Sequence, residues 1–131
     1  MKVLKSAVSS IGILILLLSL TGCMRGEYTT IHGEGGDTPN STVMKYEKFD
    51  GFVERSFQVK SGHTAEVKLD IVSDGGKLNI SIKDEEGNSY YTGTGVPTSS
   101  FSVKLDHPSQ YVISIQGKGH QGKYDIAWEL D

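Results

Sequence analysis

From residue 43 to the C-terminus, apolar and polar residues alternate with a period of two, and this pattern restricts the chain to an all-β fold. Turn signals rich in Gly, Pro, Asn and Asp interrupt the alternation about every 8 to 12 residues. Strands with one apolar and one polar face belong to antiparallel sheets that are buried on one side. Two such sheets packed together form a single antiparallel β-sandwich of about seven strands, of Ig-like or jelly-roll type, with a small closed barrel as the alternative.

The predicted core consists of the apolar face of each expected strand. Arg55 interrupts one of these faces, and Trp128 shares another with aliphatic residues, which favours a core position over a ligand platform. Residues 73–76 are predicted to form a hairpin turn and residues 117–122 a loop, because Gly tolerates positive φ. The predicted core residues are Val53, Phe57, Val59, Ala65, Val67, Leu69, Ile71, Leu78, Ile80, Ile82, Phe101, Val103, Leu105, Tyr111, Ile113, Ile115, Tyr124, Ile126, Trp128 and Leu130.

The N-terminal 22 residues have the features of a cleaved secretion signal. Lys2 and Lys5 precede an almost unbroken apolar run over residues 11–20, and Thr21 and Gly22 supply small residues before a cut. The apolar stretch is shorter than the roughly 20 residues that a membrane-spanning helix needs. A signal peptide is therefore a better interpretation than a permanent span.

Leu20, Thr21, Gly22 and Cys23 resemble the lipobox of bacterial lipoproteins. The resemblance implies a diacylglyceryl group on the Cys23 thiol, cleavage between Gly22 and Cys23, and a protein held at the extracytoplasmic face of the cell membrane. Two or more acyl chains hold a protein stably on a bilayer. Because Met24, and not Asp, follows the cysteine, the resemblance favours the outer membrane in a Gram-negative cell. The alternative is an ordinary secreted protein with one buried cysteine.

Processing at Cys23 limits the chemistry of the remaining chain. Cys23 is the only cysteine, so its lipidation leaves no thiol for a disulfide, a metal site or a nucleophile. Without Lys2 and Lys5, 11 of the 13 basic residues remain against 16 acidic ones, a net charge of −5. This charge excludes nucleic acid as a partner.

The expected domain organisation has three parts. Residues 1–22 form the signal peptide, residues 23–42 a lipidated N-terminus with a flexible tether, and residues 43–131 the β-sandwich. A tether of about 19 residues spans roughly 20 to 25 Å as a random coil. The alternative is that residues 28–31 add a short first strand.

Residues 101–130 resemble the last strands of secreted bacterial β-sandwich modules of the pre-peptidase C-terminal type. The similarity rests on Tyr-Val-Ile-Ser-Ile at 111–115, a Gly-rich loop and Gly-Lys-Tyr-Asp-Ile at 122–126. It implies a sandwich with an accessory, non-catalytic role, and it transfers no functional residue to this chain.

Candidate catalytic and metal-binding groups have no diagnostic spacing. The histidines fit no metal motif and are interpreted as solvated loop residues. The acidic stretch around Gly87 lacks the spacing of a dedicated Ca²⁺ loop and is interpreted as a hairpin turn. The sequence contains neither a Gly-x-Ser-x-Gly elbow nor Ser-x-x-Lys, so we predict no enzyme, metal or cofactor. The histidines considered as metal ligands are His32, His63, His107 and His120, and the residues considered for a Ca²⁺ loop are Asp84, Glu85, Glu86 and Asn88.

The best candidate for a contact surface is the pair Tyr90 and Tyr91, with residues 93–100. Adjacent strand residues point to opposite faces, so one tyrosine should be exposed. The alternative to a contact surface is an ordinary edge strand with one solvent-exposed tyrosine. We predict a membrane-anchored binding or accessory module whose partner is another envelope protein or a surface glycan. The alternatives are an envelope hydrolase inhibitor or immunity lipoprotein, acting through residues 117–122 or 93–100, and a small envelope hydrolase.

Overall fold

The structure is a computed structural model that describes residues 24–131, which form seven strands and no helix. The predicted signal peptide and Cys23 lie outside the described residues. None of the described residues forms a helix long and apolar enough to cross a membrane. The strands are β1 (Met24–Ile31), β2 (Glu34–Thr38), β3 (Ser41–Val59), β4 (Ala65–Asp84), β5 (Ser89–Gly93), β6 (Ser99–Leu105) and β7 (Ser109–Leu130).

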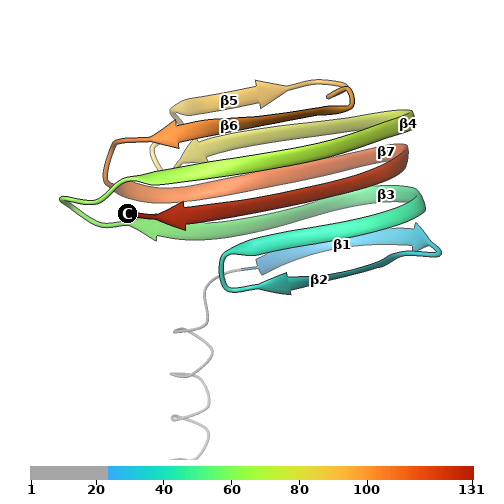
Figure 1. The fold of residues 1–131 in the computed structure, drawn as a ribbon, viewed down its shortest axis with the longest axis horizontal. Helices are drawn as coiled ribbons and strands as arrows, with labels where there is room; N and C mark the ends of the chain where they lie inside the picture. The colour runs from blue at the N-terminus through green and yellow to red at the C-terminus, as the bar shows by residue number, and fades with distance from the viewer. Residues whose placement is uncertain (1–23) are drawn as a thin grey trace, which may run out of the picture.

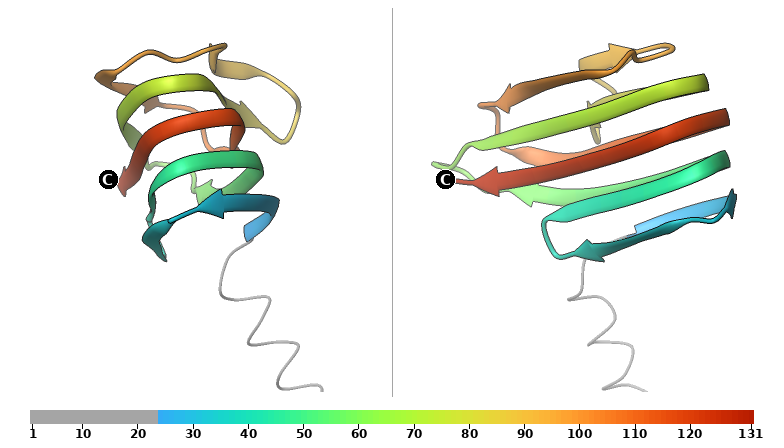
Figure 2. Two further views of the ribbon diagram at one scale, coloured as in Figure 1. Left: turned by 90° about the vertical axis from the view of Figure 1, so that its right-hand side faces the viewer. Right: turned by 45° about the vertical axis from the view of Figure 1, so that its right-hand side comes forward.

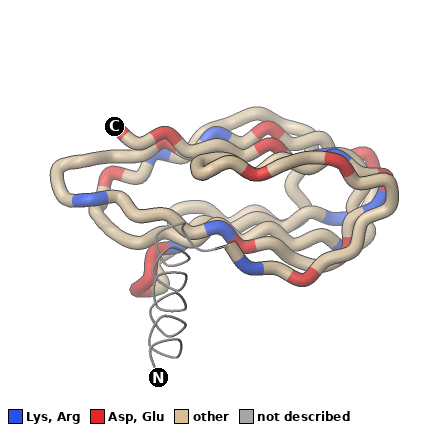
Figure 3. The backbone as a smooth tube through the Cα atoms, turned by 90° about the horizontal axis from the view of Figure 1, so that it is seen from below, with Lys and Arg blue, Asp and Glu red and all other residues tan. Residues whose placement is uncertain are grey.

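The predicted β-sandwich is confirmed, and it consists of a single antiparallel sheet folded in half (Figure 1). The long strands β3, β4 and β7 each run through both layers. Figure 2 shows them as stacked U-shaped ribbons, and Figure 3 shows the two layers as parallel runs joined at one end. Layer A contains β2, residues 41–46 of β3, residues 122–130 of β7, residues 65–73 of β4, and β6. Layer B contains β1, residues 49–59 of β3, residues 109–117 of β7, residues 75–84 of β4, and β5.

Glycine-rich bends carry the long strands from one layer to the other. At each bend the pairing register shifts, and hydrogen bonding between neighbours resumes on the far side. Gly122 has a φ of 136°, and a Cβ at this position would lie 2.0 Å from the Val72 carbonyl oxygen, so only glycine fits this bend. The hairpin turn predicted at residues 73–76 and the loop predicted at 117–122 are therefore wrong, because the chain bends there inside β4 and β7.

The apolar faces predicted from the alternation form the core between the layers. Trp128 is buried and stacks on Phe57 at a centroid distance of 5.1 Å, which confirms its core position. Three residues that were predicted to lie in the core are not fully buried: Phe101 and Val103 are half-buried on β6, and Leu130 is exposed at the end of β7. The core also contains Tyr46, Phe49 and Val96, which the alternation did not identify.

The flexible tether predicted before residue 43 is wrong for residues 24–42, which belong to the sheet. All of β1 pairs with residues 48–55 of β3, and β2 pairs with residues 41–45. Backbone hydrogen bonds hold these edge strands, while most of their side chains stay exposed. The segment therefore lacks the burial pattern that identifies a strand in a sequence. The alternative prediction of a short first strand at residues 28–31 agrees better with the structure, in which the strand already begins at Met24.

A buried histidine links the three bends. The Ser73 hydroxyl donates to the Val96 carbonyl oxygen at 2.7 Å, so it accepts from Nε2–H of His120 at 2.8 Å. The Tyr46 hydroxyl then donates to Nδ1 of His120 at 2.6 Å. His120 is fully buried, which contradicts its interpretation as a solvated loop residue, whereas His32, His63 and His107 are exposed as predicted. This arrangement stabilises the neutral imidazole.

We expect the fold to lose stability as the pH falls below the histidine range. Burial lowers the pKa of His120 below its ordinary value of 6.5, and Asp74 offsets part of that effect. The unfolded chain then binds the proton more readily. Stability is complete above about pH 7.5 and falls below about pH 6.5 by at most about 1.4 kcal/mol per pH unit, until the folded-state pKa is reached. Urea denaturation across this range measures the slope.

His120→Gln should remove this part of the pH dependence, because the amide does not titrate. The matched control is His107→Gln at an exposed position, which should leave the slope unchanged. An unaltered slope in His120→Gln would contradict the prediction.

Candidate functional site

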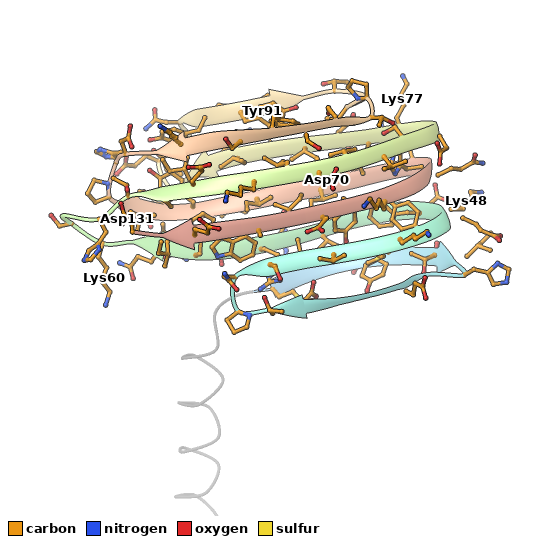
Figure 4. The ribbon with its side chains drawn as sticks, in the orientation of Figure 1. Lys48, Lys60, Asp70, Lys77, Tyr91 and Asp131 are labelled. Atoms are coloured by element: carbon orange, nitrogen blue, oxygen red, sulfur yellow. The ribbon has the colours of Figure 1, made fainter. Side chains whose placement is uncertain are left out.

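The folded sheet has two free edges, formed by β1 with β2 and by β5 with β6 (Figure 1). Tyr90 and Tyr91 lie at the second edge, where the register with β4 shifts between Ile82 and Lys83. Tyr90 packs edge-on against Tyr111 at 5.2 Å, and Tyr91 packs against Phe101 at 5.0 Å. The bulge turns both rings against the core, so both are half-buried and the expectation that one is exposed is wrong. Figure 4 shows Tyr91 on this edge. Partner contact by these residues remains a prediction.

At the other edge, a slot opens between β1 and β2, where the two layers end. Its volume is about 280 Å³. Tyr28 is the aromatic wall: its ring is 43% exposed and its inner side packs edge-on against Phe49 at 5.8 Å. Gly51 lies opposite Tyr28 with a φ of 119°, and a Cβ there would be 2.9 Å from the Tyr28 Cβ. The remaining lining residues are Thr30, Gly33, Glu34, Gly35, Gly36, Asp37, Val43 and Met44.

Tyr124 lies behind the slot and is fully buried: it is paired with Met44 across the β3–β7 ladder, and Met44 lines the slot whereas Tyr124 does not. Among residues 24–131 its hydroxyl is the only buried side-chain polar atom without a hydrogen bond of ordinary length and angle. Burial raises the pKa of Tyr124, hydrogen bonding with the Thr42 side chain opposes the rise, and Asp37 and Tyr28 add to it. A buried hydroxyl that is poorly paired costs stability.

Arg55 closes the slot at the end where β1 begins. Its guanidinium donates to the carbonyl oxygens of Thr38 and Ser41, at 2.7 Å each, and lies 3.5 Å from the Asp37 carboxylate. The same group sits over the Trp128 ring at 5.0 Å. A buried charge needs such partners, and these contacts fix β2 against β3. Figure 3 shows acidic and basic residues interspersed along the backbone of residues 24–131.

A larger hollow of about 690 Å³ lies on the outer surface near the bends. Its rim carries charges of both signs, from Lys45, Glu47, Asp74 and Lys123. Its one aromatic lining residue, Tyr46, is buried, whereas the slot presents the exposed Tyr28. The slot is therefore the better candidate site.

The groups considered for catalysis or metal binding are engaged in structural contacts. Ser73 and His120 form a Ser–His pair, but the Ser73 proton points to the Val96 carbonyl and the histidine is the donor, the reverse of an activated nucleophile. Burial alone would raise the pKa of Asp84, but hydrogen bonds from Asn88, Tyr90 and the Glu86 N–H lower it. These contacts agree with the hairpin turn predicted there. The described part of the chain contains no cluster of three metal-ligating acids or histidines.

Neither segment proposed as an inhibitor loop projects from the molecule. Residues 117–122 form the bend of β7. Residues 94–98 connect β5 to β6, and Val96 in their centre is buried, with its N–H donating to the Leu78 carbonyl at 2.8 Å. An inhibitor that inserts a loop into an active site would need a protruding segment that these residues do not form.

Sequence reasoning missed the slot because most of its lining, including Tyr28 and Asp37, belongs to the segment predicted as a flexible tether. One signal was available: Arg55 on an otherwise apolar strand face indicates a buried polar cluster nearby.

Comparison with known protein families and with curated proteins gives no match for this sequence. Several solved structures are similar at low identity. The enzymatically active domain of bacteriophage CBA120 tailspike protein 4 is 13% identical at a TM-score of 0.42, over 82% of this chain and 19% of its own, so this chain spans about a fifth of it. A carbohydrate-binding module of Cellvibrio mixtus lichenase 5A, solved with cellotriose, is 12% identical at a TM-score of 0.43; the match covers 83% of this chain and 97% of the module. The pre-peptidase C-terminal domain of Bacillus anthracis collagenase is 14% identical at a TM-score of 0.40; the match covers 82% of this chain and 89% of the domain.

We expect Tyr124→Phe to raise the free energy of unfolding by about 1 kcal/mol, because it removes a buried hydroxyl that is poorly paired and keeps the ring. The matched control is Tyr46→Phe, which should lower stability by about 1 to 3 kcal/mol because it leaves Nδ1 of His120 unpaired. Urea denaturation of both variants at neutral pH gives the two values. Equal destabilisation would mean that the Tyr124 hydroxyl is well paired in the native state.

Proposed function

We propose that this protein is a lipid-anchored, non-catalytic module of the bacterial cell envelope that binds a neutral, polyhydroxylated ligand, a glycan, in the slot between β1 and β2. The observation that carries the proposal is the slot itself, which combines the exposed Tyr28 side chain with the Glu34 and Asp37 carboxylates. An aromatic surface beside a few polar groups is a typical lining for a small-ligand site.

The lining of the slot favours hydroxyl groups over charged ligands. Glu34 and Asp37 place carboxylates in the slot and repel an anion. The Arg55 guanidinium is engaged by two carbonyl oxygens and by Asp37, so it is not free to bind a phosphate or carboxylate. Ligand hydroxyls donate to carboxylates and accept from the Thr30 hydroxyl, which also lines the slot. The exposed Tyr28 ring gives the apolar face of a sugar a surface to pack on.

The envelope location comes from the N-terminal sequence. The lipobox at Leu20–Cys23 implies an acylated Cys23, and the folded part of the chain begins at the next residue. The extracytoplasmic side of the membrane is where wall and surface glycans are found. Another envelope protein is the other partner that we consider, and the flat outer faces of the sandwich would have to supply its contact.

The glycan-binding proposal predicts that a substitution in the slot weakens the affinity for an oligosaccharide. Titration calorimetry of residues 24–131 with neutral oligosaccharides of glucose, galactose and N-acetylglucosamine should detect saturable binding of at least one. Tyr28→Ala should weaken that binding about tenfold, because the sugar loses the aromatic surface it packs on, a contact worth about 1.4 kcal/mol. The matched control, Tyr91→Ala at the opposite edge, should leave the affinity unchanged. The proposal fails if no oligosaccharide binds, or if the two variants weaken binding equally.

The anchoring proposal predicts that Cys23 carries the lipid. Cells grown with labelled palmitate should incorporate label into the wild-type chain, and mass spectrometry should place the acyl groups on a chain that begins at residue 23. Cys23→Ala should carry no label, because the thioether cannot form. A labelled Cys23→Ala chain, or an unlabelled wild-type chain, would contradict lipidation at this residue.

A further inference from the structure

Exposed apolar side chains gather on β1. Four large hydrophobic residues are exposed among residues 24–131, and three of them lie on this strand: Met24 at 55%, Tyr28 at 43% and Ile31 at 49%. The fourth is Leu130, at the end of β7. Scattered single apolar residues on a surface are ordinary, but a group on one free sheet edge indicates a contact surface.

The position of β1 in the chain identifies what this edge contacts. Met24 is both the first residue of the strand and the residue directly after Cys23. Consecutive Cα atoms lie 3.80 Å apart. If Cys23 carries acyl chains, as the proposed function requires, no tether separates the bilayer from the sandwich. The N-terminal end of β1 must then lie at the level of the lipid headgroups.

We propose that the β1 edge of the sandwich lies on the lipid surface, with Met24 and Ile31 on its two faces in contact with the bilayer interface, while Tyr28 stays packed on Phe49 in the slot. Apolar groups at such interfaces reach about 5 to 10 Å into the boundary between headgroups and acyl chains. The contact also covers the unpaired backbone groups of an edge strand, which otherwise invite pairing with another chain.

The contact is apolar rather than electrostatic. Arg25 is within 3.5 Å of the Glu54 carboxylate, and Glu27 and Glu34 add negative charge at this edge. These acids gain nothing from anionic lipids, so docking should occur on neutral phosphatidylcholine. The slot lies between β1 and β2 and not on the face of β1 alone, so the ligand of the proposed function is bound beside the membrane surface.

The full lipidated protein allows a direct test, because the thioether blocks Cys23 and leaves an introduced cysteine as the only free thiol. Thr29→Cys on β1 and Thr92→Cys on β5 place an environment-sensitive fluorophore at exposed positions on opposite edges. Both proteins are reconstituted into phosphatidylcholine vesicles that contain a lipid with a quencher near its headgroup. We expect strong quenching at position 29 and little at position 92.

A second variant separates docking from anchoring. In the Thr29→Cys protein, Met24→Gln with Ile31→Thr should leave the chain on the vesicles through its acyl groups but reduce quenching to the level seen at position 92. Leu130→Thr, at the exposed apolar residue outside β1, is the matched control and should not change it. Equal quenching at both positions in a vesicle-bound protein overturns docking alone. A wild-type chain that stays off the vesicles and carries no acyl group overturns both the anchoring and the docking.

Discussion

Continuous hydrogen bonding between β3, β7 and β4, maintained on both sides of the bends, is the constraint on which the rest of the structure depends. Because each of these strands supplies both layers, the layers cannot shift relative to each other without breaking pairs in both. The His120 contacts with Ser73 and Tyr46 join the bends of all three strands in the interior. The core side chains are thus fixed by a backbone framework that closes at one end, and the free edges need no packing of their own to keep their place.

That framework allows one edge to carry features that would be costly in a less constrained sheet. The buried Arg55 and the exposed apolar side chains of β1 lie at the β1–β2 edge. Arg55 balances part of this cost, because its contacts hold β2 in register while its charge is neutralised by carbonyl dipoles and Asp37. Stability is concentrated in the central strands, and the edge is left available for binding.

The sequence predicted the parts of the fold in which side-chain burial alone decides the structure. Central strands alternate because one face meets the core, so residues such as Val67, Ile80 and Ile113 could be assigned to it correctly. The bends could not, because a Gly-rich bend and a Gly-rich hairpin are locally alike and differ only in which distant strand is paired next. The edge strands were missed because backbone pairing holds them without a buried face. The slot brings Tyr28 of one layer beside Asp37 of the other, a juxtaposition that exists only after the sheet has folded over.

The two ends of the sandwich are unequal. Figure 4 shows Lys48 and Lys77 at the end where the strands bend, and Lys60 and Asp131 at the opposite end, which carries connecting loops and the C-terminus. At the first end, an extra residue would shift the register of a strand in both layers. At the second end, the loops at 60–64 and 106–108 connect separate strands and lie outside the ladders, so added length there leaves every pairing intact. Changes in chain length during evolution, and fusion of a reporter to Asp131, are accommodated at this end without a shift in any strand register.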